Sequence, residues 1–195
     1  MMTIRPWKKS DLDAIERIEA FCFADPWTRD NLADVLKYPH YRSFLVEDGG
    51  QVCGYGCITV MFEHAEIANI AVAAPYRGRG IGKFLLHTMH TTAKALGAEE
   101  CFLEVRTSNV NAIALYEKSG YERYGVRARY YGNEDAILMK KKLYFRNGVA
   151  PLVSPSAMKP LRGWGASYCL LFMGPVLWAL PTPGGSSAPF TLAGN

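Results

Sequence analysis

The glycine-rich segment Arg77-Gly78-Arg79-Gly80-Ile81-Gly82 constrains the fold most, because it joins a β-like run, Ile67–Val72, to an amphipathic stretch from Gly80 to Leu96. Glycines allow successive backbone N–H groups to converge on an anion, and a helix that follows adds its positive end. The order of strand, glycine loop and helix therefore predicts an α/β fold with a pyrophosphate cradle. Its candidate ligand residues are Arg77, Gly78, Arg79, Gly80, Ile81 and Gly82.

Two better-known phosphate loops do not fit this segment. A dinucleotide-binding fingerprint needs a third glycine three residues after Gly82, where Leu85 stands. A nucleotide-hydrolase loop needs Ser or Thr after Lys83, where Phe84 stands. An ordinary glycine-rich turn remains the alternative when the loop is considered alone.

Two helices are expected before this segment. Ser10 is a suitable N-cap, and apolar residues follow it at helical spacing, namely Leu12, Ile15, Ile18 and Phe21. Pro26-Trp27 interrupts the pattern, Thr28 caps a second short helix, and Pro39 stops it. The sequence therefore predicts two helices joined by an aromatic loop.

Strand patterns dominate the rest of the first three quarters of the chain. Three signals predict the order of elements: runs rich in β-branched residues, Gly and Asn residues between these runs, and a further helix cap at Ser108-Asn109. The expected strands are 43–46, 52–60, 67–72, 101–106, 121–127 and 136–143, and the expected helices are 80–96 and 109–116. The predicted fold is α/β (α+β), a mixed central sheet flanked by helices.

The composition changes after Leu143, so we place a folded domain at 1–144 and a separate tail at 145–195. The tail contains no Asp or Glu and holds 7 of the 11 prolines, which predicts irregular structure. Its apolar stretch, Tyr168–Leu180, is broken by Gly174-Pro175, whereas a bilayer span takes about 20 apolar residues. We expect no membrane span, and the sequence assigns the tail no function.

Charge and cysteine content narrow the location and the partners. The net charge of +4 comes from interspersed residues, so no direct nucleic-acid contact is expected. The five scattered cysteines and an N-terminus without a secretory pattern favour the reducing cytoplasm. The oligomeric state stays open.

No metal site is expected. Cys53 and Cys57 enclose a strand-like Gly-Tyr-Gly and are followed by no second pair at zinc spacing. His87 and His90, three apart on a predicted helix, are more typical of surface histidines.

The segment from Asn69 through Pro75-Tyr76 into the glycine loop resembles the acetyl-CoA-binding motif of GNAT acetyltransferases. From Ile4 to Leu143 the chain also resembles the RimI-type enzymes, which acetylate the N-terminal alanine of a small-subunit ribosomal protein. The similar segments are 23–27, 66–72, 103–106 with Ser108-Asn109, 112–116, 129–131 and 134–136. The resemblance implies the GNAT fold, acetyl-CoA as co-substrate, and the N-terminal segment of a ribosomal acceptor protein as partner.

Acyl transfer from a thioester to an amine requires a neutral amine and a proton for the leaving sulfur. Glu104 is an acidic residue inside an apolar strand, and Tyr116 lies on the following helix. The matching Glu and Tyr of RimI-type enzymes are assigned the roles of base and acid. The plainer alternatives are a Glu104–Arg106 ion pair and a core tyrosine whose hydroxyl is satisfied.

Further site residues are expected around these two. The backbone of Ile70, Ala71 and Val72 is expected to hold the pantetheine arm, and Asn109 contacts the cofactor or only caps its helix. Candidates for a peptide-binding wall are Phe23, Pro26, Trp27, Tyr130 and Tyr131, and Glu66 either contacts the amine or caps a strand. Two other functions stay open: acetylation of a lysine or small amine, and a non-catalytic acetyl-CoA-binding module.

Overall fold

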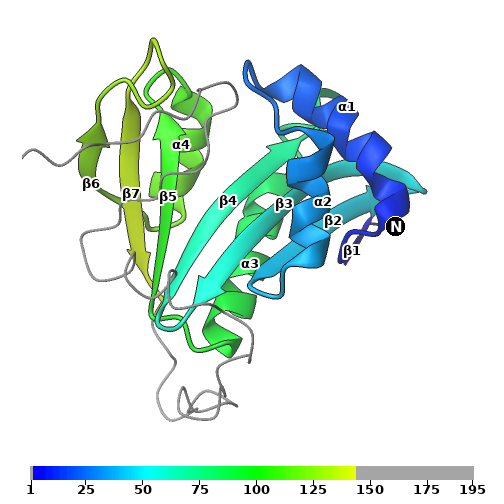
Figure 1. Cartoon of the computed structure of the whole chain (residues 1–195), viewed down its shortest axis with the longest axis horizontal. Helices are drawn as coiled ribbons and strands as arrows, with labels where there is room; N and C mark the ends of the chain where they lie inside the picture. The colour runs from blue at the N-terminus through cyan, green and yellow to red at the C-terminus, as the bar shows by residue number, and fades with distance from the viewer. Residues whose placement is uncertain (1, 144–195) are drawn as a thin grey trace, which may run out of the picture. The chain divides into compact units, whose positions relative to one another are not determined.

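The computed structural model describes residues 2–143, so the tail predicted at 145–195 and its boundary at residue 144 lie outside the described residues. The described part contains a seven-stranded sheet with the order β1-β2-β3-β4-β5-β7-β6 (Figure 1). The strands are β1 (Met2–Arg5), β2 (Tyr41–Asp48), β3 (Gln51–Met61), β4 (His64–Val72), β5 (Glu100–Arg106), β6 (Glu122–Arg127) and β7 (Ala136–Lys142).

One junction inside the sheet is unlike the others. Neighbouring strands pair antiparallel except β4 and β5, which are parallel. Their pairing covers only three residues of each strand and ends at Glu66 and Phe102. Beyond that point the strands diverge, as Figure 1 shows. The sheet therefore contains an interruption at its centre, which we call the β4–β5 divergence.

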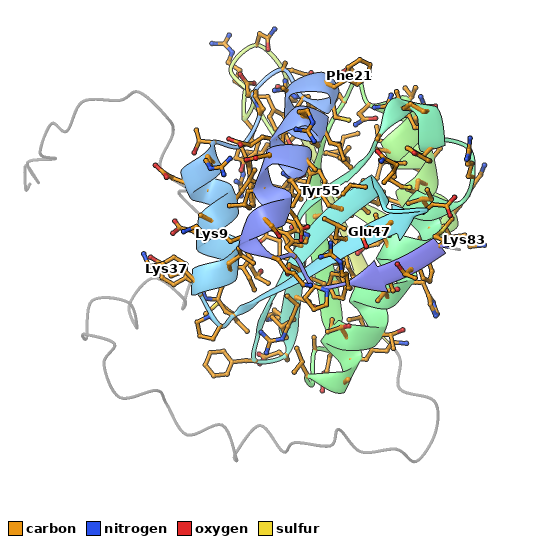
Figure 2. All side chains as sticks on the ribbon, turned by 90° about the vertical axis from the view of Figure 1, so that its right-hand side faces the viewer. Lys9, Phe21, Lys37, Glu47, Tyr55 and Lys83 are labelled. Carbon is orange, nitrogen blue, oxygen red and sulfur yellow. The ribbon has the colours of Figure 1, made fainter. Side chains whose placement is uncertain are left out.

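Two helices cover each face of the sheet (Figure 1). On one face lie α1 (Leu12–Cys22) and α2 (Arg29–Lys37), and on the other lie α3 (Ile81–Ala95) and α4 (Val110–Lys118). Each face has its own apolar core, and Tyr55, labelled in Figure 2, belongs to the core beneath α1. No helix within residues 2–143 is long and apolar enough to cross a membrane.

The sequence explains where two of the four α-helices of residues 2–143 begin, namely α2 and α4. The hydroxyl of Thr28 accepts a hydrogen bond from the backbone N–H of Asn31 at 3.3 Å, which confirms the predicted cap of α2. Asn109 caps α4 in the same way by accepting from the N–H of Ala112 at 3.2 Å. Ser10 is not the cap of α1, because a short 3-10 turn, Lys9–Asp11, precedes that helix.

Three details differ from the sequence-based expectations. The Phe21 ring is 69% exposed (Figure 2), because the inward stripe of α1 continues from Ile15 and Ile18 to Glu19 and Cys22 rather than to Phe21. His90 is buried rather than on the surface. The four-residue strand β1 was not predicted, since a strand this short leaves too few residues for an alternating pattern.

The burial of His90 depends on a hydrogen-bonded chain in the core beneath α3. Its Nε2 lies 2.8 Å from the hydroxyl of Tyr121, and that hydroxyl donates to the thiol of Cys101 at 3.1 Å. Burial lowers the pKa of His90 to about 3, so its ring is neutral at physiological pH. A buried polar network of this kind is tolerated because its members supply each other's partners.

Candidate active site

The edge of β4 that faces the β4–β5 divergence carries backbone groups that no neighbouring strand pairs, and of these the Val72 carbonyl accepts from the side chains of Arg77 and Cys22. The N–H of Ala73 donates to the carbonyl of Cys53 on β3 at 2.9 Å. Because peptide groups alternate in direction along a strand, those of Ala71 point to β3 as well, and those of Ile70 and Val72 point to the side that β5 has left. This edge can therefore pair with an extended ligand.

The glycine loop lies between the end of β4 and the start of α3. Gly78 and Gly80 have φ angles of 76° and 80°, which favour glycine, and the space where a Cβ would stand is open at both. Arg77 donates from Nε to the carbonyl of Val72 at 3.0 Å and from Nη2 to the thiol of Cys22 at 3.1 Å. The Arg77 side chain thus ties the loop to β4. The N–H of Arg77 donates to the carbonyl of Ala74 at 3.2 Å, so the N–H groups from Gly78 to Gly82 are those that remain for an anion.

These two features fit acetyl-CoA, whose extended pantetheine arm carries amide groups and whose nucleotide end carries a pyrophosphate. The arm would pair with Ile70 and Val72, and the pyrophosphate would meet the loop and the N-terminal end of α3. Ala71 uses its peptide groups on β3, and Asn109 uses its side-chain oxygen as a cap. For these two predicted residues the structure offers a structural role.

Two glutamates lie on the same face of the sheet at the β4–β5 divergence. Glu66 is in the last pair of the β4–β5 ladder, and Glu104 stands two residues beyond that ladder on β5. Side chains alternate along a strand, and the neighbours of both glutamates pack into the core beneath α3 and α4. These neighbours are Ala65, Ile67, Leu103 and Val105. Both carboxylates therefore lie on the face covered by α1 and α2.

Glu104 is held by groups from the far side of β7. Its Oε1 lies 2.9 Å from Nη1 of Arg127 on β6. Burial raises the pKa of the Tyr130 phenol, and hydrogen bonding to Glu104 raises it further. The alternative ion pair with Arg106 is not formed, because Arg106 binds Asp25 at 2.6 Å and Glu134 at 3.4 Å.

Glu66 differs from Glu104 in having no fixed partner. Within residues 2–143 its carboxylate takes part in no hydrogen bond or ion pair. Burial raises its pKa to about 7, the charge of Glu104 raises it as well, and Arg127 opposes the shift. Glu66 therefore exchanges a proton near neutral pH, where an acyl transfer to an amine would need a base.

Tyr116 lies on the other face of the sheet. It is 6% exposed and packs edge-on against Tyr121, with ring centroids 5.7 Å apart. Its hydroxyl bonds to no protein group in the described part of the chain, and it is not among the fully buried polar atoms that lack a partner, so solvent reaches it. Burial raises its pKa, and nearby Tyr131 adds to the effect, so the phenol is neutral and able to donate its proton.

An ion pair ties the loop between α1 and α2 to β5. This loop carries Phe23, Pro26 and Trp27, and Asp25 in the same loop forms the ion pair with Arg106 on β5. The guanidinium of Arg106 also lies 4.1 Å from the centre of the Tyr131 ring. Asp25 and Tyr131 thus contact the same guanidinium, whereas the side chains of Phe23 and Trp27 pack against the core beneath α1.

Glu19 anchors this loop and was not singled out from the sequence. Its carboxylate is almost fully buried and accepts from the N–H of Trp27 at 2.8 Å, from Nδ2 of Asn69 at 2.6 Å and from the hydroxyl of Tyr55. Burial raises its pKa. An acidic residue inside the apolar stripe of α1, four positions after Ile15, was the available signal. No comparable signal marked Arg127.

Comparison with known proteins connects this geometry to a family. The family model for the acetyltransferase (GNAT) family matches residues 12–121. That range contains the glycine loop, both glutamates and Tyr116.

Individual relatives match over nearly their whole length. The ribosomal protein bS18-alanine N-acetyltransferase of Escherichia coli strain K12 is 34% identical over 143 residues, 71% of this chain and 96% of that protein. The N-alpha-acetyltransferase RimI of Mycobacterium tuberculosis is 35% identical over 149 residues, 72% of this chain and 92% of that protein. The crystal structure of the ribosomal-protein-S18-alanine N-acetyltransferase from Escherichia coli superimposes with a TM-score of 0.69 at 32% identity, covering 75% of this chain and 96% of that one.

Proposed function

Since this chain belongs to the GNAT acetyltransferase family and is an acetyl-CoA-dependent N-acetyltransferase, we propose that it acetylates the α-amine at the N-terminus of a protein. The acceptor is an N-terminal alanine of a small-subunit ribosomal protein. Similarity over 96% of the length of an enzyme named for that reaction supports this substrate, and a second relative is named an N-alpha-acetyltransferase. The reaction is carried by residues of the domain 1–144.

The observation that carries the proposal is the pair of carboxylates, Glu66 and Glu104, at the β4–β5 divergence. Both lie on the face of the sheet that α1 and α2 cover. A protein α-amine has a pKa of about 7.7–8.0, whereas that of a lysine side chain is about 10.4. Glu66, whose pKa burial raises to about 7, can take a proton from a protein α-amine far more readily than from a lysine side chain. This difference favours an N-terminal amine over lysine.

The proposed roles follow from where each group lies. Glu104 accepts a proton from the amine as the carbon–nitrogen bond forms, and Tyr116 gives its proton to the sulfur as the carbon–sulfur bond breaks. Backbone groups of Ile70 and Val72 align the pantetheine arm, and those of Gly78 to Gly82 bind the pyrophosphate. Acetyl-CoA supplies the activated acetyl group, so no covalent enzyme intermediate is needed.

The aromatic wall selects the first residues of the acceptor. Phe23, Pro26 and Trp27 come from the α1–α2 loop, and Tyr130 and Tyr131 come from the segment between β6 and β7. Rigid rings on two sides of the acceptor would favour a small first side chain such as that of alanine.

Mass spectrometry of acetyl transfer tests this function with three peptides. One begins with the free N-terminal residues of the organism's own S18 protein, one has the same sequence with a blocked N-terminus and an internal lysine, and one begins with a bulky residue. Acetylation of the first alone supports the proposal. Modification of the lysine peptide alone, or of none, would replace it with a lysine or small-amine acetyltransferase.

A further inference from the structure

A buried carboxylate that the proposed reaction does not use lies between α1 and the sheet. Glu19 is 1% exposed and continues the inward face of α1, which otherwise carries the apolar residues Leu12, Ile15 and Ile18. Burying a carboxylate is costly unless hydrogen-bond donors surround it. The donors that surround Glu19 therefore show which parts of the domain it connects.

The two oxygens of Glu19 serve different elements. Oε1 accepts from Nδ2 of Asn69 on β4 at 2.6 Å and from the hydroxyl of Tyr55 on β3, the ring labelled in Figure 2. Oε2 accepts from the backbone N–H of Trp27 in the α1–α2 loop at 2.8 Å. Hydrogen bonds to an ionised group are stronger than those between neutral groups. Glu19 thus holds the sheet with one oxygen and the α1–α2 loop with the other.

Asn69 lies at an irregularity in β4. Cys57 on β3 pairs with Asn69, but the next residue, Ile58, pairs with Ile67, so Ala68 is an extra residue in β4. The side chains of Ala68 and Asn69 both lie on the α1 side of the sheet, as expected for a β-bulge. A bulge redirects the strand that follows it, and the strand that follows this one is the edge proposed to pair with acetyl-CoA.

The α1–α2 loop depends on Glu19 for its attachment to the sheet. Residues 23–28 belong to neither helix, so they lack the regular backbone hydrogen bonds of such an element. The N–H of Trp27 bonds to no other group in the described residues. The ion pair of Asp25 with Arg106 also holds the loop, but the Asp25 side chain is 77% exposed, whereas Glu19 is buried. Glu19 is therefore the firmer of these two attachments.

We propose that Glu19 is a positioning residue that sets the α1–α2 loop, and with it the acceptor, against the edge of β4 that binds acetyl-CoA. The inference rests on the proposed function and extends it from the reacting groups to the alignment of the two substrates. Glu19 touches neither substrate and transfers no proton. It fixes the distance between the two binding sites, on which the approach of the amine to the thioester depends.

Three substitutions separate the two connections, with steady-state kinetics and calorimetry as the measurements. Glu19→Met removes every acceptor at nearly constant length, so the KM for an N-terminal alanine peptide and the Kd for acetyl-CoA should each rise about 3–10-fold. Asn69→Ala removes only the connection to β4 and should raise only the Kd. Tyr55→Phe is the control, because it removes one donor and leaves both connections. It should lower the melting temperature and change neither constant.

Two results would overturn the proposal. If Tyr55→Phe raised both constants in proportion to its loss of melting temperature, as Glu19→Met did, general destabilisation would explain the data. If Asn69→Ala raised the KM for the peptide and left the Kd for acetyl-CoA unchanged, the bond from Glu19 to β4 would not serve the acetyl-CoA edge.

Glu19→Gln is the conservative variant, and with Asn69→Ala it decides the matter if Glu19→Met does not fold. Its amide oxygen can accept from the N–H of Trp27, and its NH2 group can donate to the Tyr55 hydroxyl and to a turned Asn69 amide. Both connections are then kept, so both constants should stay within about threefold of wild type. A loss of about tenfold or more in Glu19→Gln would contradict the proposal, because the charge rather than the connections would then be essential.

Amide hydrogen exchange is a measurement that needs no turnover. The N–H of Trp27 should exchange about tenfold or more faster in Glu19→Met than in wild type, and at the wild-type rate in Tyr55→Phe and Asn69→Ala. Wild-type exchange in Glu19→Met would refute the inference even if the enzyme acetylates α-amines. Failure of the wild type on every N-terminal peptide, with the expected exchange rates, would instead count against the proposed function.

Discussion

Oε1 of Glu104 on β5 lies 2.9 Å from Nη1 of Arg127 on β6, although β7 stands between these strands. The guanidinium of Arg127 is also 4.9 Å from the centre of the Tyr130 ring, so one cation orders both the carboxylate and part of the aromatic wall. This ion pair fixes the position of the Glu104 carboxylate and contributes little to the stability of the fold, because partly exposed pairs add at most about 1 kcal/mol.

Glu104→Gln should lower kcat by about 10²–10³-fold at pH 7.5 while the Kd for acetyl-CoA stays unchanged. The amide keeps the shape of the side chain and removes its ability to accept a proton. Steady-state kinetics and calorimetric titration with acetyl-CoA give the two values. Glu100→Gln on the same strand, where the carboxylate lies 4.0 Å from Nζ of Lys140, is the control and should retain wild-type kcat.

Tyr116→Phe should reduce kcat by about 10–100-fold without lowering the melting temperature, because the Tyr116 hydroxyl binds no other group in residues 2–143. Tyr121→Phe provides the contrast. It removes a hydroxyl that lies between His90 and Cys101, and it should cost about 1–3 kcal/mol of stability. If both variants lost stability and kcat in parallel, Tyr116 would be a core residue rather than the acid.

Gly80→Glu should weaken acetyl-CoA binding by about 10–100-fold, since a carboxylate near the pyrophosphate repels it by on the order of 1–3 kcal/mol. Gly97→Glu isolates the charge effect. Gly97 also has a positive φ, 95°, and open space around it, but it lies at the other end of α3. Equal losses of affinity in the two variants would mean that backbone strain, and not the anion site, explains the result.

Glu66→Gln should stabilise the free protein at pH 8. A pKa raised from 4.5 to about 7 means that the folded state holds a proton more tightly than the unfolded state, so stability falls as pH rises through that window. The loss reaches about 3 kcal/mol above pH 7 and vanishes below pH 4.5. Melting curves at the two extremes should therefore differ from wild type only at the higher pH. A melting-temperature gain that is equal at pH 4.5 and pH 8 would contradict the shifted pKa.

Asp25→Asn should raise the KM for the peptide and leave the Kd for acetyl-CoA unchanged. The change weakens the contact with Nη2 of Arg106, which is the ion pair between the α1–α2 loop and β5. We expect a severalfold effect, because the Asp25 side chain is largely exposed. Asp30→Asn, at an exposed position in α2, should change neither constant.

Local signals in the sequence were enough for most of the fold. Thr28 and Asn109 cap their helices because a short polar side chain meets free backbone N–H groups there, and this depends only on neighbouring residues. The strand–glycine loop–helix step was likewise a local pattern. His90 was misplaced because its burial depends on Tyr121, a partner distant in sequence. Phe21 was misplaced because the inward stripe of α1 passes through Glu19 instead.

The site was predictable in its residue types more than in its pairings. Glu104 was marked by its position in an apolar strand, but its partner Arg127 comes from a strand two places away in the sheet. The β4–β5 divergence could not be predicted from local sequence, because the sequences of β4 and β5 are both typical of ordinary strands. Without that geometry, Glu66 could not be told apart from a residue that merely begins a strand.

The β4–β5 divergence also has a consequence for how the protein survives in a cell. An unpaired strand edge is a template for pairing with other chains. Here such an edge is part of the proposed acetyl-CoA site, where proline or a charged residue would prevent the co-substrate from pairing. A bound co-substrate would occupy this edge and so prevent it from pairing with other chains. At an acetyl-CoA concentration 100 times the Kd, binding would add about 2.7 kcal/mol to the stability of the fold. The lifetime of this enzyme would then follow the supply of its own acetyl donor.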